Sequence, residues 1–148
     1  MQRISSLCRS LGVLAAMGGV GGGAMLVGCQ SEPNRQRHGP VWATYSGPTL
    51  SAELGVDVRV PAVLAAAEAA LVQRGYSVVS RRGTEDSGRI EALPPGAGRS
   101  GRPGVWEKVW VSARVTSRGT QVKVKFEPWG DEAISRAILD DLLYRLGI

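Results

Sequence analysis

The chain has few residues of the kinds that build redox, metal and nucleophilic sites. Its 148 residues include two cysteines, Cys8 and Cys29, and a single histidine, His38. A Ser-His-Asp triad or a histidine-ligated metal needs its histidine on a folded element, whereas His38 lies in a polar stretch without hydrophobic periodicity. The sequence therefore predicts no metal site and no histidine-dependent catalysis, and it favours a protein that is not an enzyme.

Acidic residues are also in the minority, but only slightly. The chain has 18 Lys and Arg against 13 Asp and Glu, for a formal net charge of +5. Positions 1–28 hold two of the basic residues, Arg3 and Arg9, and no acid. From residue 29 onward the chain therefore carries 16 basic and 13 acidic residues, a net charge of +3. This modest excess does not indicate a nucleic-acid partner.

One long uncharged apolar run is present, over residues 11–27. It follows Arg3 and Arg9, an order typical of a secretory signal peptide. A transmembrane helix is the alternative, but the run has 17 residues and six of them are glycine. A membrane span needs about 20 apolar residues, and each interior glycine costs a helix about 1 kcal/mol relative to alanine. The pattern favours a cleaved signal over residues 1–28.

The end of this segment carries a short motif. Leu26, Val27, Gly28 and Cys29 resemble the lipobox of bacterial lipoprotein signal peptides. The resemblance implies cleavage before Cys29, with palmitate or a similar acyl chain on its sulfur and a further chain on its new amino group. Two or three acyl chains hold a domain on a bilayer almost permanently. The resemblance implies a location in the cell envelope, and Gln30 in place of Asp after the lipidated cysteine favours the outer membrane, facing the periplasm, over the inner membrane.

The rest of the chain divides into a linker and one domain. Residues 29–48 are mostly polar and predict a flexible tether with a mean reach of about 25 Å, with order expected to begin between Val41 and Thr49. Residues 49–148 are enough for a single two-layer domain. Because Cys8 leaves with the signal, Cys29 is the one cysteine of the mature chain, and no internal disulfide is expected.

Hydrophobic periodicity over residues 49–148 predicts the order β-α-β-β-β-β-α. The predicted strands span 49–58, 76–82, 89–93, 105–115 and 120–127, and the predicted helices span 61–74 and 131–146. Strands flanked by helices are typical of an α+β fold. We expect a two-layer sandwich, in which an antiparallel sheet of four to five strands carries both helices on one face.

Details of the helices support these assignments. Alanines in the first helix favour helix formation and let the backbone approach a sheet closely. Asp131 is well placed to cap the second helix, where its charge opposes the helix dipole. Asp140 and Asp141 are neighbours on that helix and point about 100° apart. They cannot share a proton as a catalytic pair, and the sequence predicts that they belong to the solvated helix surface.

The start of the last helix also carries a family likeness. Gly130, Asp131, Ser135, Ile138 and Leu139 form a Gly-Asp-x-x-x-Ser-x-x-Ile-Leu pattern. Together with the lipobox and the Ala-rich first helix, it resembles a family of small bacterial lipoproteins known as a domain of unknown function. The resemblance implies the fold and the location. It implies no active site, because no activity is established for that family.

A glycine-rich stretch, residues 96–101, matches the GxGxxG pattern of dinucleotide-binding loops. Such a loop needs a helix directly after it to receive the phosphates, whereas here Pro103 and a predicted strand follow. The sequence therefore predicts an ordinary loop and no cofactor.

One side of the strand over residues 105–115 is unusual for a solvated surface. Its alternate residues are Trp106, Lys108, Trp110, Ser112 and Arg114, and Lys123 and Lys125 are expected on the same face of the next strand, with Trp110 opposite either Lys125 or Glu127. Two interpretations stay open. In the first, tryptophan rings pack over lysine stems within the sheet. In the second, this is an interaction face for a protein, a lipid headgroup or an anionic glycan.

These observations favour an envelope protein anchored to the membrane through its lipid, with a non-catalytic binding or scaffolding role. The alternative is a carrier or assembly factor for an anionic lipid or glycolipid, which would need a groove or cavity. An envelope hydrolase is less favoured, since it would need paired carboxylates or a Ser-Lys pair within one pocket.

Overall fold

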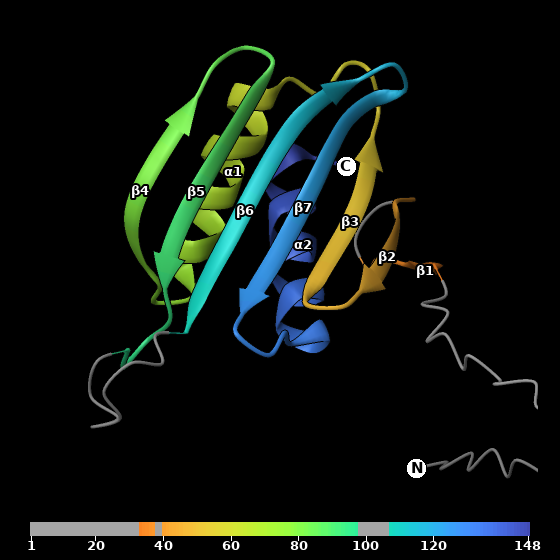
Figure 1. Cartoon of the computed structure of the whole chain (residues 1–148). Helices are drawn as coiled ribbons and strands as arrows, with labels where there is room; N and C mark the ends of the chain where they lie inside the picture. Colours follow the sequence, from red (N-terminus) through yellow and green to blue (C-terminus); the bar gives the residue numbers. More distant parts are fainter. Residues whose placement is uncertain (1–32, 38–39, 98–106) are drawn as a thin grey trace, which may run out of the picture.

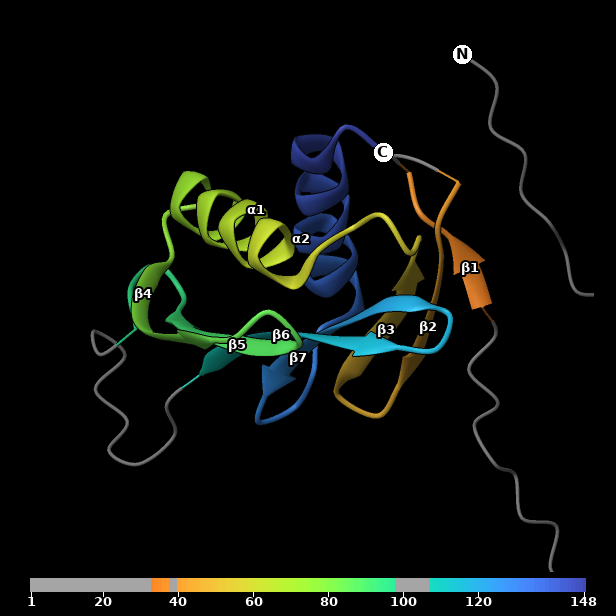
Figure 2. The ribbon, with the colours of Figure 1, turned by 90° about the horizontal axis from the view of Figure 1, so that it is seen from above.

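The computed structural model describes residues 33–37, 40–97 and 107–148. These residues form two layers, an antiparallel sheet and two helices that lie on one of its faces (Figure 1, Figure 2). The helices are α1, Val60–Gln73, and α2, Glu132–Leu146. The predicted α+β sandwich with two helices on one face of the sheet is confirmed.

The sheet has the spatial order β1-β2-β3-β7-β6-β5-β4, and each neighbouring pair is antiparallel. Its strands are β1 Pro33–Arg35, β2 Trp42–Ser46, β3 Thr49–Leu54, β4 Ser77–Gly83, β5 Ser87–Leu93, β6 Lys108–Thr116 and β7 Gly119–Glu127. The four strands after α1 occur along the chain as predicted, and the structure shows that they are also neighbours in the sheet in the same order. Strand β3 pairs with β7, so the first strand of the predicted domain lies beside its last strand in the sheet.

Two strands were not predicted. Both β1 and β2 fall within residues 29–48, where the sequence predicts a tether, and they extend the sheet beyond four to five strands. In β2 the fully buried position is Ala43, whereas Trp42 is 60% exposed. The larger apolar side chain thus faces solvent and the smaller one faces the core, so the alternation that identifies a half-buried strand is hidden. Strand β2 pairs with β3, with Ala43 opposite Ala52 at one end of the ladder.

The core lies between the two layers, and α1 approaches the sheet through small and branched residues. Those buried on α1 are Val60, Val63, Leu64, Ala66, Ala67, Ala70 and Leu71. The packing around Leu64 is especially close. A Cβ atom would lie 2.6 Å from Leu64 Cδ1 at Gly83 and 2.3 Å from it at Gly88. Glycine at these two positions of the β4–β5 hairpin therefore leaves room for a core leucine of α1.

Helix α2 has a defined start and end. The Asp131 carboxylate accepts a hydrogen bond from the backbone N–H of Ile134 at 2.8 Å, which confirms the predicted N-cap. Gly147 ends the helix with a φ of 76°, a conformation that costs glycine little. The last helix is thus defined at both ends by local backbone chemistry.

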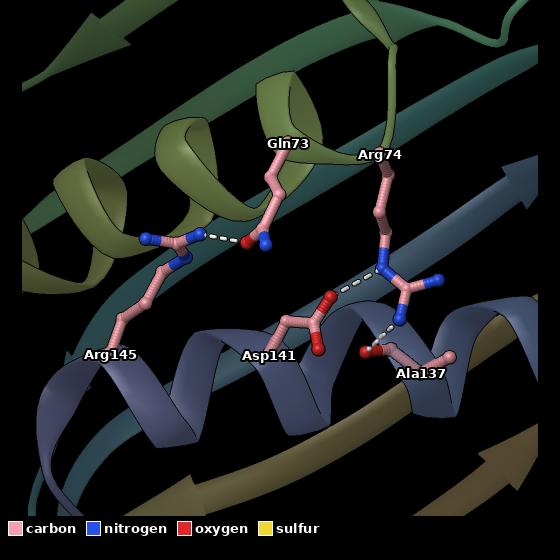
Figure 3. Close-up of polar contacts among 5 residues, drawn as sticks. All are labelled: Gln73, Arg74, Ala137, Asp141 and Arg145. Carbon is pink, nitrogen blue, oxygen red and sulfur yellow. Dashed lines mark hydrogen bonds and ion pairs between the residues drawn. The ribbon is translucent and has the colours of Figure 1, made fainter.

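Polar contacts join the two helices where they face each other (Figure 3). Arg74 follows α1, and its Nε donates to Asp141 Oδ2 at 2.5 Å while its Nη2 donates to the carbonyl oxygen of Ala137 at 3.1 Å. Nearer the C-terminus, Arg145 donates to the side-chain oxygen of Gln73. These contacts fix α2 relative to the end of α1.

The two neighbouring aspartates of α2 have more specific roles than the predicted solvated surface. Asp141 pairs with Arg74, as described above, and Asp140 accepts a hydrogen bond from the backbone N–H of Arg37 at 3.0 Å. Both partners are distant in sequence: Arg74 and Asp141 are 67 residues apart, and Arg37 and Asp140 are 103 residues apart. Contacts of this range leave no periodic signal in the sequence, since they depend on how the helix is placed.

Candidate interaction face of the sheet

The sheet has one face against the helices and one face turned away from them, here termed the open face. Figure 1 looks onto the open face, with both helices behind the sheet. Strand β6 shows the division clearly, because Val109, Val111 and Ala113 are buried on the helix side and the residues between them are not. The charged residues of the open face, placed by their register, are Arg35, Glu53, Arg82, Arg89, Glu91, Lys108, Arg114, Lys123, Lys125 and Glu127.

Trp110 lies at the centre of a polar cluster on this face, consisting of Glu91, Lys108, Trp110, Lys125 and Glu127. Trp110 is paired with Lys125 on β7, one of the two predicted registers. Its indole N–H donates to Glu127 Oε2 at 2.9 Å. Lys125 forms an ion pair with Glu127, and Lys108 Nζ lies 2.6 Å from Glu91 Oε1. With two cations and two carboxylates, the polar cluster has no net charge.

The polar cluster affects the titration of Glu127. Its carboxylate accepts hydrogen bonds from Lys125 and from Trp110. These bonds, in that order of importance, hold the pKa of Glu127 below its ordinary value of 4.5, because they favour the charged form.

Two cations also lie over the ring of Trp110. The Arg89 guanidinium carbon is 4.6 Å from the ring centroid, and Lys108 Nζ is 5.8 Å from it. Both distances are within the range of a cation–π interaction. Arg89 comes from β5, whose register with β6 was not predicted.

Four cations form a basic patch on the open face, consisting of Arg82, Arg89, Arg114 and Lys123. Three of them lie in one row across the strands, in which Lys123 pairs with Ser112, Ser112 with Arg89, and Arg89 with Arg82. Arg114 lies in the next row, between Gln121 and Ser87. Within residues 33–37, 40–97 and 107–148, none of the four forms an ion pair.

The structure brings most of the predicted face together. Lys108, Trp110, Arg114, Lys123 and Lys125 share the open face. The contacts of Lys108, Trp110 and Lys125 are internal, which favours the packing interpretation for these three, whereas Arg114 and Lys123 belong to the basic patch. Arg82 and Arg89 were missed, because they come from a hairpin whose place beside β6 is set by strand order. Other predicted residues lie outside the described part of the chain: Leu26, Val27, Gly28, Cys29, His38 and Trp106.

A groove of about 700 Å³ lies at the edge of the open face, beside β2 and β3. It is lined on this side by Trp42, Thr44, Ser51, Glu53 and Gln121. Trp42 lies two residues before Thr44 on β2, so both side chains point to the same face. Trp42 is 60% exposed, and the sequence predicts no ordered role for it, because it falls within the predicted tether.

The residues of the lipoprotein-like pattern in α2 have structural roles. Gly130 has a φ of 77° and Asp131 caps the helix. Ser135, Ile138 and Leu139 are buried. The pattern therefore describes how α2 begins and packs.

The described residues contain no group of three or more His, Cys, Asp and Glu side chains able to hold a metal ion. Lys123 lies between Ser51 and Ser112 across the strands, but it is on the open face and outside the groove. Among the helices that the structure describes, none is long and apolar enough to cross a membrane.

No family model matches the chain, and no curated protein matches it. The resemblance to the lipoprotein family of unknown function therefore stays a prediction from the sequence.

Proposed function

We propose that this chain is a lipid-anchored protein of the bacterial cell envelope whose folded domain is a non-catalytic binding module. The lipobox-like residues ending at Cys29 support the anchor, and the basic residues and apolar run before them support export. Gln30 supports an outer-membrane location, with the domain in the periplasm. The open face is the proposed docking surface.

The spacing between the anchor and the domain supports this arrangement. Strand β1 begins at Pro33, so three residues separate it from Cys29. Four residue steps span at most about 14 Å. A lipid at Cys29 would therefore hold the β1 edge of the sheet close to the bilayer. This edge would lie nearer to the bilayer than a flexible tether of 20 residues would allow on average.

The observation that carries the binding role is the basic patch. Arg82 and Arg89 are directly opposite each other on neighbouring strands, and like charges in this position destabilise a sheet. The polar cluster beside them shows that the same face can pair its cations with carboxylates. Cations left without such partners on an uncovered face are typical of a surface that meets an anionic partner.

Site-specific photocrosslinking in cells tests the docking surface. A crosslinking residue replaces Ser112, in the middle of the open face, and in a matched control it replaces Ala65, an exposed position on α1. We expect a crosslinked protein, lipid or glycan from position 112 and little from position 65. Equal yields from both positions would contradict the proposed surface.

The anchor is tested separately. Incorporation of a labelled palmitate is expected in the wild-type chain and is expected to be lost in Cys29→Ser, together with partitioning into the detergent phase. Separation of inner from outer membranes then reports the location. An unlabelled wild-type chain would contradict lipidation.

Carriage of an anionic lipid or glycolipid is a second candidate function. The groove beside Trp42 favours it, since about 700 Å³ lies within the range of small-molecule sites. A carrier would extract fluorescent lipid from donor vesicles and deliver it to acceptor vesicles. A docking module would bind the vesicles without transfer.

A further inference from the structure

The net positive charge of the mature chain comes from the open face. This face has seven cations and three carboxylates, which gives +4. The chain from residue 29 onward has a net charge of +3, from 16 basic and 13 acidic residues. The remaining nine basic and ten acidic residues therefore have a net charge of −1. Such an asymmetry orients a molecule in front of a negatively charged surface.

The excess is concentrated within that face. The polar cluster is neutral, and Glu53 lies near the other edge of the sheet, where it accepts hydrogen bonds from Gln121 and Thr116. The basic patch accounts for four of the seven cations, and Arg35 lies on β1 opposite Trp42. An anion bound there would relieve the repulsion between Arg82 and Arg89.

The chemistry of the basic patch fits phosphate groups spread over a surface. Arginine binds phosphate through two parallel hydrogen bonds, and lysine binds it as a point charge. The four side chains come from four strands, β4, β5, β6 and β7, and stand on one side of the sheet. They can thus contact several anions spread over the same surface.

Trp42 adds a second feature on the same face. Tryptophan is enriched where a protein meets the interface between water and lipid, because its ring is apolar and its N–H is polar. Trp42 is exposed, lies in the strand next to β1, and is therefore near the proposed anchor.

We infer that the open face docks onto the anionic phospholipid headgroups of the membrane in which the chain is anchored, with the basic patch on the phosphates and Trp42 at the interface. This inference rests on the proposed function, because the lipid at Cys29 is what keeps the domain beside the bilayer. It gives the docking surface a partner of defined chemistry.

Vesicle binding by the mature chain carrying Cys29→Ser tests the inference without the anchor. This chain, from residue 29 to residue 148, contains every described helix and strand. Binding is measured by co-sedimentation with vesicles of phosphatidylcholine alone and of phosphatidylcholine mixed with phosphatidylglycerol. We expect binding to the mixed vesicles, weakened by salt, and little binding to the neutral ones.

The decisive variant combines Arg82→Gln, Arg114→Gln and Lys123→Gln. Arg89 is kept, because it contacts the ring of Trp110. Each cation near an anionic bilayer strengthens binding about fivefold, so we expect a loss of about a hundredfold. The matched control removes the same charge outside the open face, through Arg59→Gln, Arg136→Gln and Arg145→Gln. Circular dichroism checks that both variants are folded.

Near wild-type binding by the control supports the inference. An equal loss in both variants would overturn it, since vesicle binding would then depend on net charge and not on the position of the cations. Binding to soluble dextran sulfate but not to vesicles would also overturn it and assign the patch to a glycan.

Trp42→Ser is expected to weaken vesicle binding, and unchanged binding would remove Trp42 from the interface. Since this chain lacks the anchor, a negative result here leaves palmitate labelling of the wild type as a separate test of the proposed function.

Discussion

At the scale of single residues, Trp110 shows how an aromatic side chain is accommodated on a sheet face that no helix covers. Its ring lies under Arg89 and Lys108, and its N–H donates a hydrogen bond to Glu127. The hydrogen bond also orients the ring, because the indole has a single donor. Trp110 is therefore a packing residue of the open face, around which the charged side chains are arranged.

Trp110→Ala is expected to destabilise the fold by about 2 kcal/mol, from a cation–π contribution of about 0.5–1 kcal/mol and a hydrogen bond of about 1 kcal/mol. Trp129 is the matched control, because it is 85% exposed in the turn before α2. Trp129→Ala is expected to change stability by less than about 0.5 kcal/mol. Urea denaturation followed by circular dichroism measures both. Equal losses would show that the contacts of Trp110 contribute nothing.

Glu127 gives the polar cluster a pH dependence. Because its pKa in the folded state lies below the ordinary value of 4.5, the charged carboxylate stabilises the fold above that pH, and the contribution is lost as the pH falls through the folded pKa. Glu127→Gln is therefore expected to be less stable than wild type at neutral pH, with a difference that shrinks in acid. Glu85→Gln, in the exposed β4–β5 turn, serves as the control. A difference that is constant with pH would contradict this account.

At the scale of elements, the connection between β7 and α2 depends on one glycine. Gly130 combines a φ of +77° with close neighbours, since a Cβ there would lie 2.4 Å from the Tyr45 hydroxyl and 2.8 Å from Pro48 Cα. Those neighbours belong to the β2–β3 hairpin. Gly130 therefore lets the start of α2 pack against a hairpin from the other end of the domain.

Gly130→Ala and Gly147→Ala form a matched pair that separates packing from backbone conformation. Gly147 has a φ of +76°, and a Cβ added there would have no neighbour within 4 Å, so its substitution is expected to cost about 1 kcal/mol for the left-handed backbone. Gly130→Ala adds the steric overlap and is expected to cost about 3 kcal/mol. Chemical denaturation measures the two. Similar costs would show that Tyr45 and Pro48 can move aside.

The elements differ in how far their sequences predict them. Strands β6 and β7 alternate cleanly, and the cap at Asp131 is a local signal, so both predictions are confirmed. Strand β2 was missed because its buried residue is Ala43 and its exposed residue is Trp42. The neighbours of Trp110 within β6 and β7 could be predicted, but Arg89 could not, because its position depends on the register between β5 and β6.

At the scale of the whole molecule, the two faces of the domain differ in chemistry. The helix side pairs its charges, as Arg74 does with Asp141 and Arg136 with Glu132. The open face keeps a positive excess, and it also holds all three lysines of the chain, Lys108, Lys123 and Lys125. Chemical labelling of lysine side chains therefore reports on the open face alone.

This distribution allows docking to be measured on the lipidated protein itself, reconstituted in vesicles. Lys123 is exposed and forms no ion pair among the described residues, so an amine-reactive reagent should label it several-fold more slowly in vesicles containing phosphatidylglycerol than in phosphatidylcholine alone. Lys108 and Lys125 should change less, because their ammonium groups already pair with carboxylates. Nitration of Tyr144, which is 73% exposed on α2, should be equal in both. Peptide mass spectrometry reads each site, and unchanged labelling of Lys123, or equal protection of Tyr144, would contradict docking through the open face.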